Sequence, residues 1–260
     1  MINYVKAELL KILKTRFIWI LSGAYFLLFI SFFYQFTFNE DANVMEILLK
    51  DSINLYSFFI IMFTAFFNII FAVAIGSHIG SKEFSYNTMQ NSIQSSGRYN
   101  LLIAKIITWL ILTVIFVLSI ASLGILLGLI HEPIIRMFSM FDFISRLSFG
   151  ISSTFLLGLF AMTVSTILRS TSKSNVLCLI LFLGQNLLPF SRSTKFLYYI
   201  NPYYYISYYA DFMFSNLKGL SHQSFSTINT LTSSQNVLCI FGYFAICLVV
   251  QFLIFRKREY

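Results

Sequence analysis

The chain has 260 residues, of which 58% are hydrophobic and 11% are charged. A soluble domain carries about a quarter charged residues, so this composition excludes a soluble enzyme, a disordered tail and a disulfide-stapled secreted module. The net charge of +8 comes from basic residues beside apolar runs, a pattern that indicates orientation in a bilayer rather than nucleic-acid binding.

Six apolar stretches predict an all-α integral membrane protein with six transmembrane helices in a single domain of residues 1–260. The predicted spans are residues 17–36, 55–76, 106–130, 147–168, 176–190 and 236–255. The first is too long for the apolar region of a signal peptide, so it is interpreted as a retained span. The fifth is short and contains Gly184 and Pro189, which leaves a broken span or a re-entrant segment as alternatives.

The basic residues predict the orientation. Twelve of the 18 lysines and arginines lie in segments 1–16, 77–105, 169–175 and 256–260, although the segments on the other side are longer in total. This bias predicts that both termini are cytoplasmic. In the outer segment 191–235, Asn201-Pro202 is expected to open a short helix, and the tyrosines around Tyr203–Tyr205 are expected to form an interfacial aromatic belt.

Polar residues within the spans are few. No acid or base lies in the middle of a predicted span, which weighs against ion-coupled carriers. The run from Gly76 to Lys82 lacks the spacing of a phosphate-binding loop and is interpreted as a loop leaving the second span, so the chain is not expected to bind ATP itself. The amides of Asn68, Gln185 and Asn186 are candidates for lining a substrate pathway, with hydrogen bonding between helices as the alternative.

The segment between the second and third spans has the clearest pattern. Phe84, Thr88, Met89 and Ile93 fall on one stripe of a helix, and Gly97 can end that helix. This spacing predicts a short amphipathic cytoplasmic coupling helix, which could lie on lipid or dock on a protein partner.

The same segment resembles that of ABC type-2 permeases, the membrane subunits of one exporter class. In that family an acidic residue follows the second span, and a Gly-Thr pair, an amphipathic stretch, a Pro-x-x-Arg-like turn and a basic residue entering the third span come after it. The corresponding residues here are Glu83, Asn87-Thr88, Ser95-Ser96-Gly97-Arg98 and Lys105. Asn87 replaces the usual Gly, and no Pro precedes Arg98. The basic amphipathic opening and the six spans extend the resemblance over nearly the whole chain.

The resemblance implies a permease without a nucleotide site of its own. Its partners would be a cytoplasmic ABC ATPase dimer, which binds ATP and Mg²⁺, and a second permease that is either an identical copy or a sister protein. It also implies which residues contact the ATPase: Glu83, Phe84, Thr88, Met89 and Arg98.

The cargo is inferred from the same resemblance. Small Phe-rich permeases of this length look like those that protect bacteria against bacteriocins or antimicrobial peptides, which implies export of an amphipathic or hydrophobic cargo from a bacterial plasma membrane. The alternatives are a non-transporting scaffold or sensor subunit and a passive channel. A membrane enzyme ranks last, because no acid, base or metal constellation is visible in the sequence.

Overall fold

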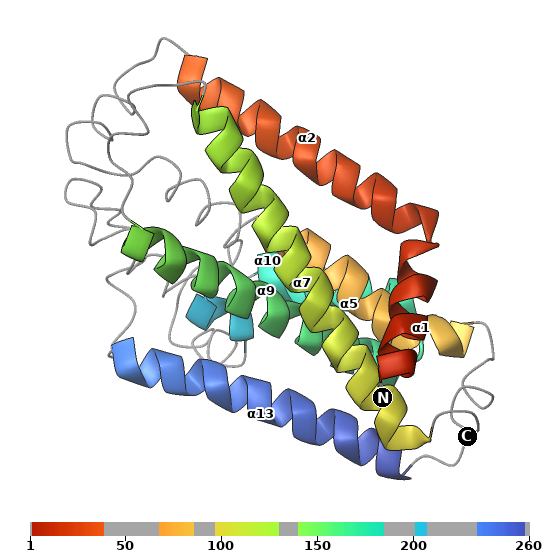
Figure 1. Cartoon of the computed structure of the whole chain (residues 1–260). Coiled ribbons are helices and arrows are strands. Elements are labelled where there is room, and N and C mark those ends of the chain that lie inside the picture. Colours follow the sequence, from red (N-terminus) through yellow and green to blue (C-terminus); the bar gives the residue numbers. More distant parts are fainter. Residues whose placement is uncertain are drawn as a thin grey trace.

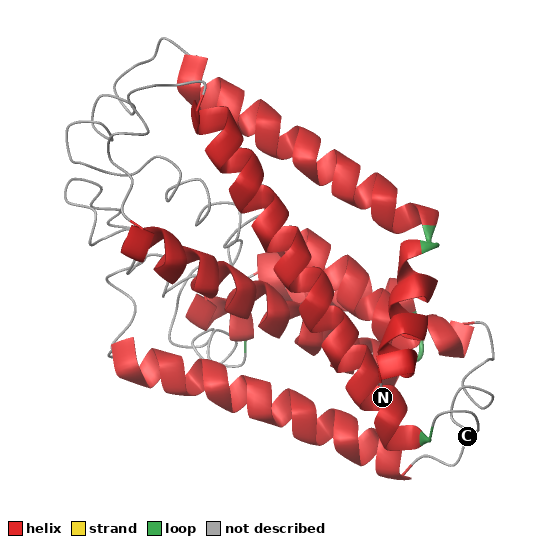
Figure 2. Cartoon of the chain, in the orientation of Figure 1, coloured by secondary structure: helices red, strands yellow, loops and turns green. Residues whose placement is uncertain are grey.

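The computed structural model describes residues 2–38, 68–85, 97–129, 140–184, 201–206 and 233–257. Every regular element in these ranges is helical (Figure 2). The helices are α1 (Ile2–Leu13), α2 (Arg16–Phe38), α5 (Asn68–Ser85), α7 (Arg98–Leu129), α9 (Met140–Leu168), α10 (Thr171–Gly184) and α13 (Ser233–Lys257). A further helical turn covers residues 202–206. Long apolar runs favour helices because a helix satisfies its backbone polar groups internally, as hydrocarbon requires.

Three of the described helices are long and apolar enough to cross a membrane on their own. These segments are Tyr99–Leu126 in α7, Phe143–Leu168 in α9 and Val237–Arg256 in α13. The bent pair α1 and α2 makes a fourth if it is counted as one span. Helix α10 is shorter, and α5 contains only residues 68–76 of the predicted second span, whose first part lies outside the described residues. The all-helical membrane architecture is therefore confirmed, whereas six crossings remain a prediction.

Helix α5 corrects one expectation from the sequence. Residues 76–82 are not a loop but continue the helix to Ser85. Gly76 and Gly80 lie four residues apart and face α9, where a Cβ on Gly76 would lie 2.8 Å from the Cα of Gly158 and a Cβ on Gly80 would lie 3.1 Å from the Cα of Met162. Small residues at this spacing let helix backbones approach closely within a membrane. The two glycines therefore form a Gly-x-x-x-Gly packing face.

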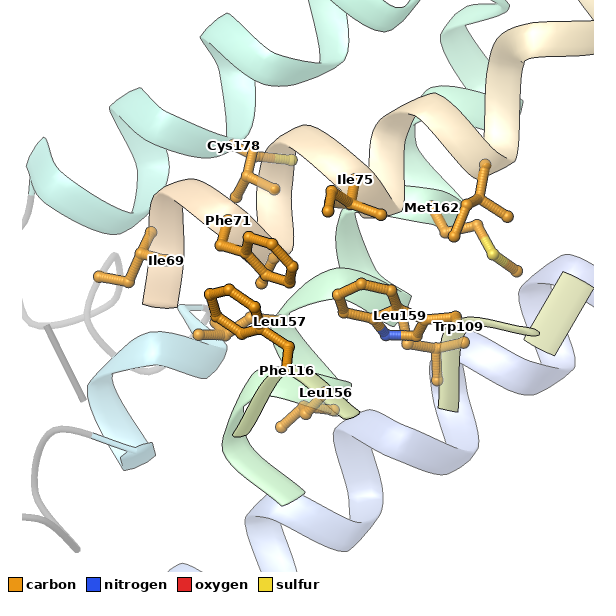
Figure 3. Packing of buried hydrophobic residues seen from close by; sticks show 14 of the residues in the cluster. Ile69, Phe71, Ile75, Trp109, Phe116, Leu156, Leu157, Leu159, Met162 and Cys178 are labelled. Carbon is orange, nitrogen blue, oxygen red and sulfur yellow. The ribbon is translucent and has the colours of Figure 1, made fainter. Parts of the chain in front are cut away.

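Helices α5, α7 and α9 enclose the centre of the core (Figure 3). Phe71 of α5 stacks on Phe116 of α7, with ring centroids 3.3 Å apart and planes within 6° of parallel. Trp109 of α7 is fully buried, and its Nε1 donates to the carbonyl of Phe155 on α9 at 2.9 Å. Helices gain little by burying apolar surface from lipid, so close packing and such hydrogen bonds hold them together.

Helices α9 and α10 form a hairpin with a two-residue turn. Arg169 adopts a φ of 52°, the left-handed conformation that commonly ends a helix. Ser170 then caps α10, since its Oγ accepts from the amide of Lys173 at 3.4 Å. The hairpin returns α10 across α5, where the hydroxyls of Ser77 and Ser174 lie 2.9 Å apart.

The turn over residues 202–206 begins at Pro202, directly after Asn201, as the sequence predicts. Asn201 fixes its position: Oδ1 accepts from the amide of Tyr203 at 3.0 Å, and Nδ2 donates to the carbonyl of Leu181 on α10 at 2.7 Å. The expected interfacial belt is wrong for Tyr203–Tyr205, which are at most 7% exposed. Because Asn201 joins the turn to α10, these rings pack against α10 and α13 instead of lipid headgroups.

Candidate coupling site at the basic end of the bundle

The described parts of the predicted cytoplasmic segments meet at one end of the bundle (Figure 1). We call this the basic end, defined by residues 2–16, 77–85, 97–105, 169–175 and 252–257. Its basic residues are Lys6, Lys11, Lys14, Arg16, Lys82, Arg98, Lys105, Arg169, Lys173, Arg256 and Lys257. The structure thus gathers segments far apart in the sequence, while their cytoplasmic side remains a prediction.

Helices α1 and α2 meet in an elbow bent by 69°. The break is held by side chains: Thr15 Oγ1 donates to the carbonyl of Lys11 at 3.0 Å, and Trp19 Nε1 donates to the carbonyl of Leu13 at 2.7 Å. These bonds satisfy carbonyls that a helix leaves open at its C-terminal end. On α1, Ile12 is buried and the carboxylate of Glu8 pairs with Lys11 at 2.6 Å. The elbow is therefore a defined corner of the fold.

Lys82, near the end of α5, reaches this elbow. Its Nζ donates to the carbonyl of Lys11 at 3.0 Å and to Thr15 Oγ1 at 2.8 Å. Burial lowers the pKa of the Lys82 ammonium, while the nearby carboxylate of Glu8 acts in the opposite direction. One cation thus joins the last turns of α5 to the corner between α1 and α2.

A second lysine joins α5 to α7. Lys105 is 2% exposed, and its Nζ donates to the carbonyl of Ile79 at 2.7 Å. An ammonium group this deep needs such a partner, because burial without one is costly. Burial lowers the pKa of the neighbouring His78 to about 4, and the charges of Lys82 and Lys105 act in the same direction, so this imidazole is neutral at physiological pH.

The structure places only part of the predicted ATPase contact. Glu83 and Phe84 belong to the last turn of α5, and Arg98 is the first residue of α7. For these three residues the structure describes the backbone and not the side chain. Thr88 and Met89, with the predicted coupling helix, lie outside the described residues. Gly97 has a φ of 74°, and its carbonyl accepts from the amide of Leu101 at 3.1 Å. It therefore stands at the N-terminal boundary of α7.

Among the pathway candidates, Asn68 lies within the described residues. It is fully buried, its Oδ1 accepts from the hydroxyl of Tyr25 on α2, and its Nδ2 donates to Thr154 Oγ1 on α9 at 2.6 Å. This amide therefore links three helices. Gln185 and Asn186 lie outside the described residues.

Sequence reasoning missed the partners in these contacts. Tyr25 and Thr154 are two of several hydroxyl residues in apolar helices, and nothing in their spacing indicates that they meet Asn68. Lys105 stands out only as a basic residue entering the third span, and its burial against the Ile79 carbonyl is decided by how α5 and α7 cross. Nothing in the sequence around Lys82 predicts that this side chain contacts residues near position 15.

Apolar helices of membrane-spanning length, joined to a compact end rich in lysine and arginine, define a multi-pass membrane protein. Residues 4–185 match the family described as ABC-2 family transporter protein. Since this match covers well over half of the chain, the protein belongs to that family and is the membrane permease component of an ABC-2 type transporter. Permeases of this family lack nucleotide-binding domains and associate with an ABC ATPase. No curated protein matches the chain.

Proposed function

We propose that this permease is the transmembrane subunit of an exporter for an amphipathic or hydrophobic cargo in a bacterial plasma membrane. In this proposal the single domain of residues 1–260 crosses the bilayer six times, with both termini in the cytoplasm. It pairs with a second permease, identical or a sister protein, to enclose the pathway. A separate ABC ATPase dimer supplies the energy by hydrolysing ATP with Mg²⁺. Antimicrobial peptides of the bacteriocin kind, or drugs, are the proposed cargo.

One observation carries the proposal: the two helices that flank residues 86–96, α5 and α7, are both anchored to the rest of the bundle. On one side, Lys82 ties the end of α5 to the α1–α2 elbow at 2.8–3.0 Å. Lys105 ties the start of α7 to the Ile79 carbonyl of α5 at 2.7 Å. A displacement of the intervening segment would therefore reach α1, α2, α5 and α7 together, which is what a coupling segment needs.

For this segment and the residues that flank it, 83–98, we assign roles from the helical spacing. Phe84, Thr88 and Met89 would present the apolar stripe that enters a groove on the ATPase. Glu83 and Arg98 would make charged contacts at the rim, which orient the two proteins more than they add affinity.

The proposed pathway involves amides rather than charges. Gln185 and Asn186 follow directly after α10 and are proposed to line the substrate pathway. Asn68 would join them only if α2 or α9 moved, since its amide group is now bonded to Tyr25 and Thr154. A pathway of neutral amides and apolar side chains suits a cargo that already partitions into the bilayer.

The test compares two aspartate substitutions with a matched control. Phe84→Asp and Met89→Asp each place a charge on the predicted apolar stripe, whereas Gln90→Asp places the same charge on its polar face. The first two should abolish co-purification with the ATPase and stimulation of its ATP hydrolysis, and the third should preserve both. Equal behaviour of all three variants would refute the assigned contact.

A second experiment addresses transport. Vesicles containing the permease, its partner permease and the ATPase should move a fluorescent cationic amphipathic peptide only when ATP and Mg²⁺ are present. Flux without ATP would favour a passive channel, and no movement with a fully active ATPase would favour a scaffold or sensor subunit.

A further inference from the structure

Helices α9 and α13 are joined at one end and separated at the other. Toward the basic end, Gln251 Nε2 of α13 donates to Thr163 Oγ1 of α9 at 2.9 Å, and Phe252 stacks on Tyr99 of α7 with ring centroids 4.9 Å apart. Toward the opposite end the helices enclose a cavity of about 380 Å³. The rings of Phe155 and Phe244, with centroids 5.9 Å apart, line the cavity on its side toward the joined end. The two helices thus line a cleft beyond this contact.

The lining of this cleft is apolar. Its described part is formed by ten residues, which lie between Ser145 and Leu156 on α9 and between Val237 and Phe244 on α13, and none of these ten is titratable. Two of its serines use their hydroxyls within α9: Ser148 donates to the carbonyl of Ser145 at 2.7 Å, and Ser152 donates to the carbonyl of Ser148 at 2.7 Å. An occupant therefore meets hydrocarbon surface and few available donors, so a charged or strongly hydrogen-bonding group would bind poorly.

The α9 wall of the cleft is about as long as one leaflet is thick. From Ser145 to Leu156 the helix rises about 17 Å at 1.5 Å per residue, and half of a bilayer's hydrocarbon core is about 15 Å. Both walls belong to segments long and apolar enough to cross the membrane. A hydrocarbon chain that lies along this apolar groove would therefore stay within the depth of the bilayer.

We propose that the α9–α13 cleft is a binding site for one acyl chain of a membrane lipid, drawn from the leaflet that surrounds the N-terminal halves of these two helices. The chain lies along the serine stripe of α9, between Phe149 and Phe241, and keeps the two helices apart. The contact of Gln251 with Thr163 sets the depth that the chain can reach.

The experiment uses the full chain, delipidated in mild detergent, with palmitoyl-oleoyl phosphatidylglycerol as the probe and native mass spectrometry to count bound lipid. The double substitution Ser148→Phe and Ser152→Phe fills the cleft and should weaken lipid binding at least about tenfold. The control is Leu238→Phe, at a side chain of α13 that is 70% exposed and does not line the cleft; it should bind like the unaltered protein. Equal lipid binding by the double variant would overturn the proposal.

A second measurement needs no variant, so it stands even if the double substitution impairs folding. Oleate, which supplies only the chain, should displace the bound lipid from the unaltered protein, whereas glycerophosphoglycerol, which supplies only the headgroup, should not. Three results would each overturn the assignment to an acyl chain: displacement by the headgroup alone, failure of oleate to compete, or no binding of the added phosphatidylglycerol.

Discussion

Replacing Gly76 by alanine should destabilise the protein by forcing α5 away from α9. The new Cβ would lie 2.8 Å from the Cα and 2.9 Å from the carbonyl carbon of Gly158. Both are backbone atoms, which cannot rotate out of the way as a side-chain tip can. Overpacking of this kind costs about 1–3 kcal/mol.

The matched control is Gly242→Ala on α13, because a Cβ there would meet no heavy atom within 4 Å. Both substitutions gain the same helix propensity, about 0.8–1 kcal/mol, so this contribution cancels when the two variants are compared. The difference in unfolding free energy should therefore be about 1–3 kcal/mol, with Gly76→Ala the less stable.

Reversible unfolding in mixed micelles with increasing dodecyl sulfate, followed by circular dichroism, measures this difference. Trp109 gives a second readout, since its ring packs on Gly158 and its fluorescence should change when α5 and α9 separate. If Gly76→Ala is as stable as Gly242→Ala to within about 0.5 kcal/mol, the close approach of the two helices is refuted.

Three further predictions concern the polar contacts. Asn68→Leu should lower the unfolding free energy by about 1–2 kcal/mol in the same assay, because it leaves two buried hydroxyls without their amide partner; unchanged stability would contradict the three-helix link. Lys82→Met should speed amide hydrogen exchange around the α1–α2 elbow, whereas Lys14→Met, at an exposed position, should not; equal exchange in both would contradict the contact. The pKa of His78 falls from 6.5 to about 4 on folding, so the unfolded chain binds more protons between these values and stability should decrease as pH falls from 6.5 toward 4. The control His78→Gln should remove this part of the pH dependence, and an identical pH profile for both proteins would contradict it.

Much of the helical architecture could be predicted from the amino-acid sequence. An apolar run in a bilayer must be helical to satisfy its backbone, so α7, α9 and α13 follow directly from hydropathy. The bias of lysine and arginine identified the segments that meet at the basic end. Local chemistry was equally informative at Asn201-Pro202, which opens a helical turn. Gly97 was predicted to end the coupling helix, which lies outside the described residues; the structure places Gly97, with its positive φ, directly before α7.

Only the tertiary structure determines which face of each helix packs against which neighbouring helix. A membrane helix is apolar all round, so periodicity does not distinguish a face toward lipid from a face toward protein. The packing role of Gly76 and Gly80, the burial of Tyr203–Tyr205 and the lysine contacts of α5 all depend on that choice. The cleft between α9 and α13 depends on it as well, since its walls are the side chains that these two helices turn toward each other.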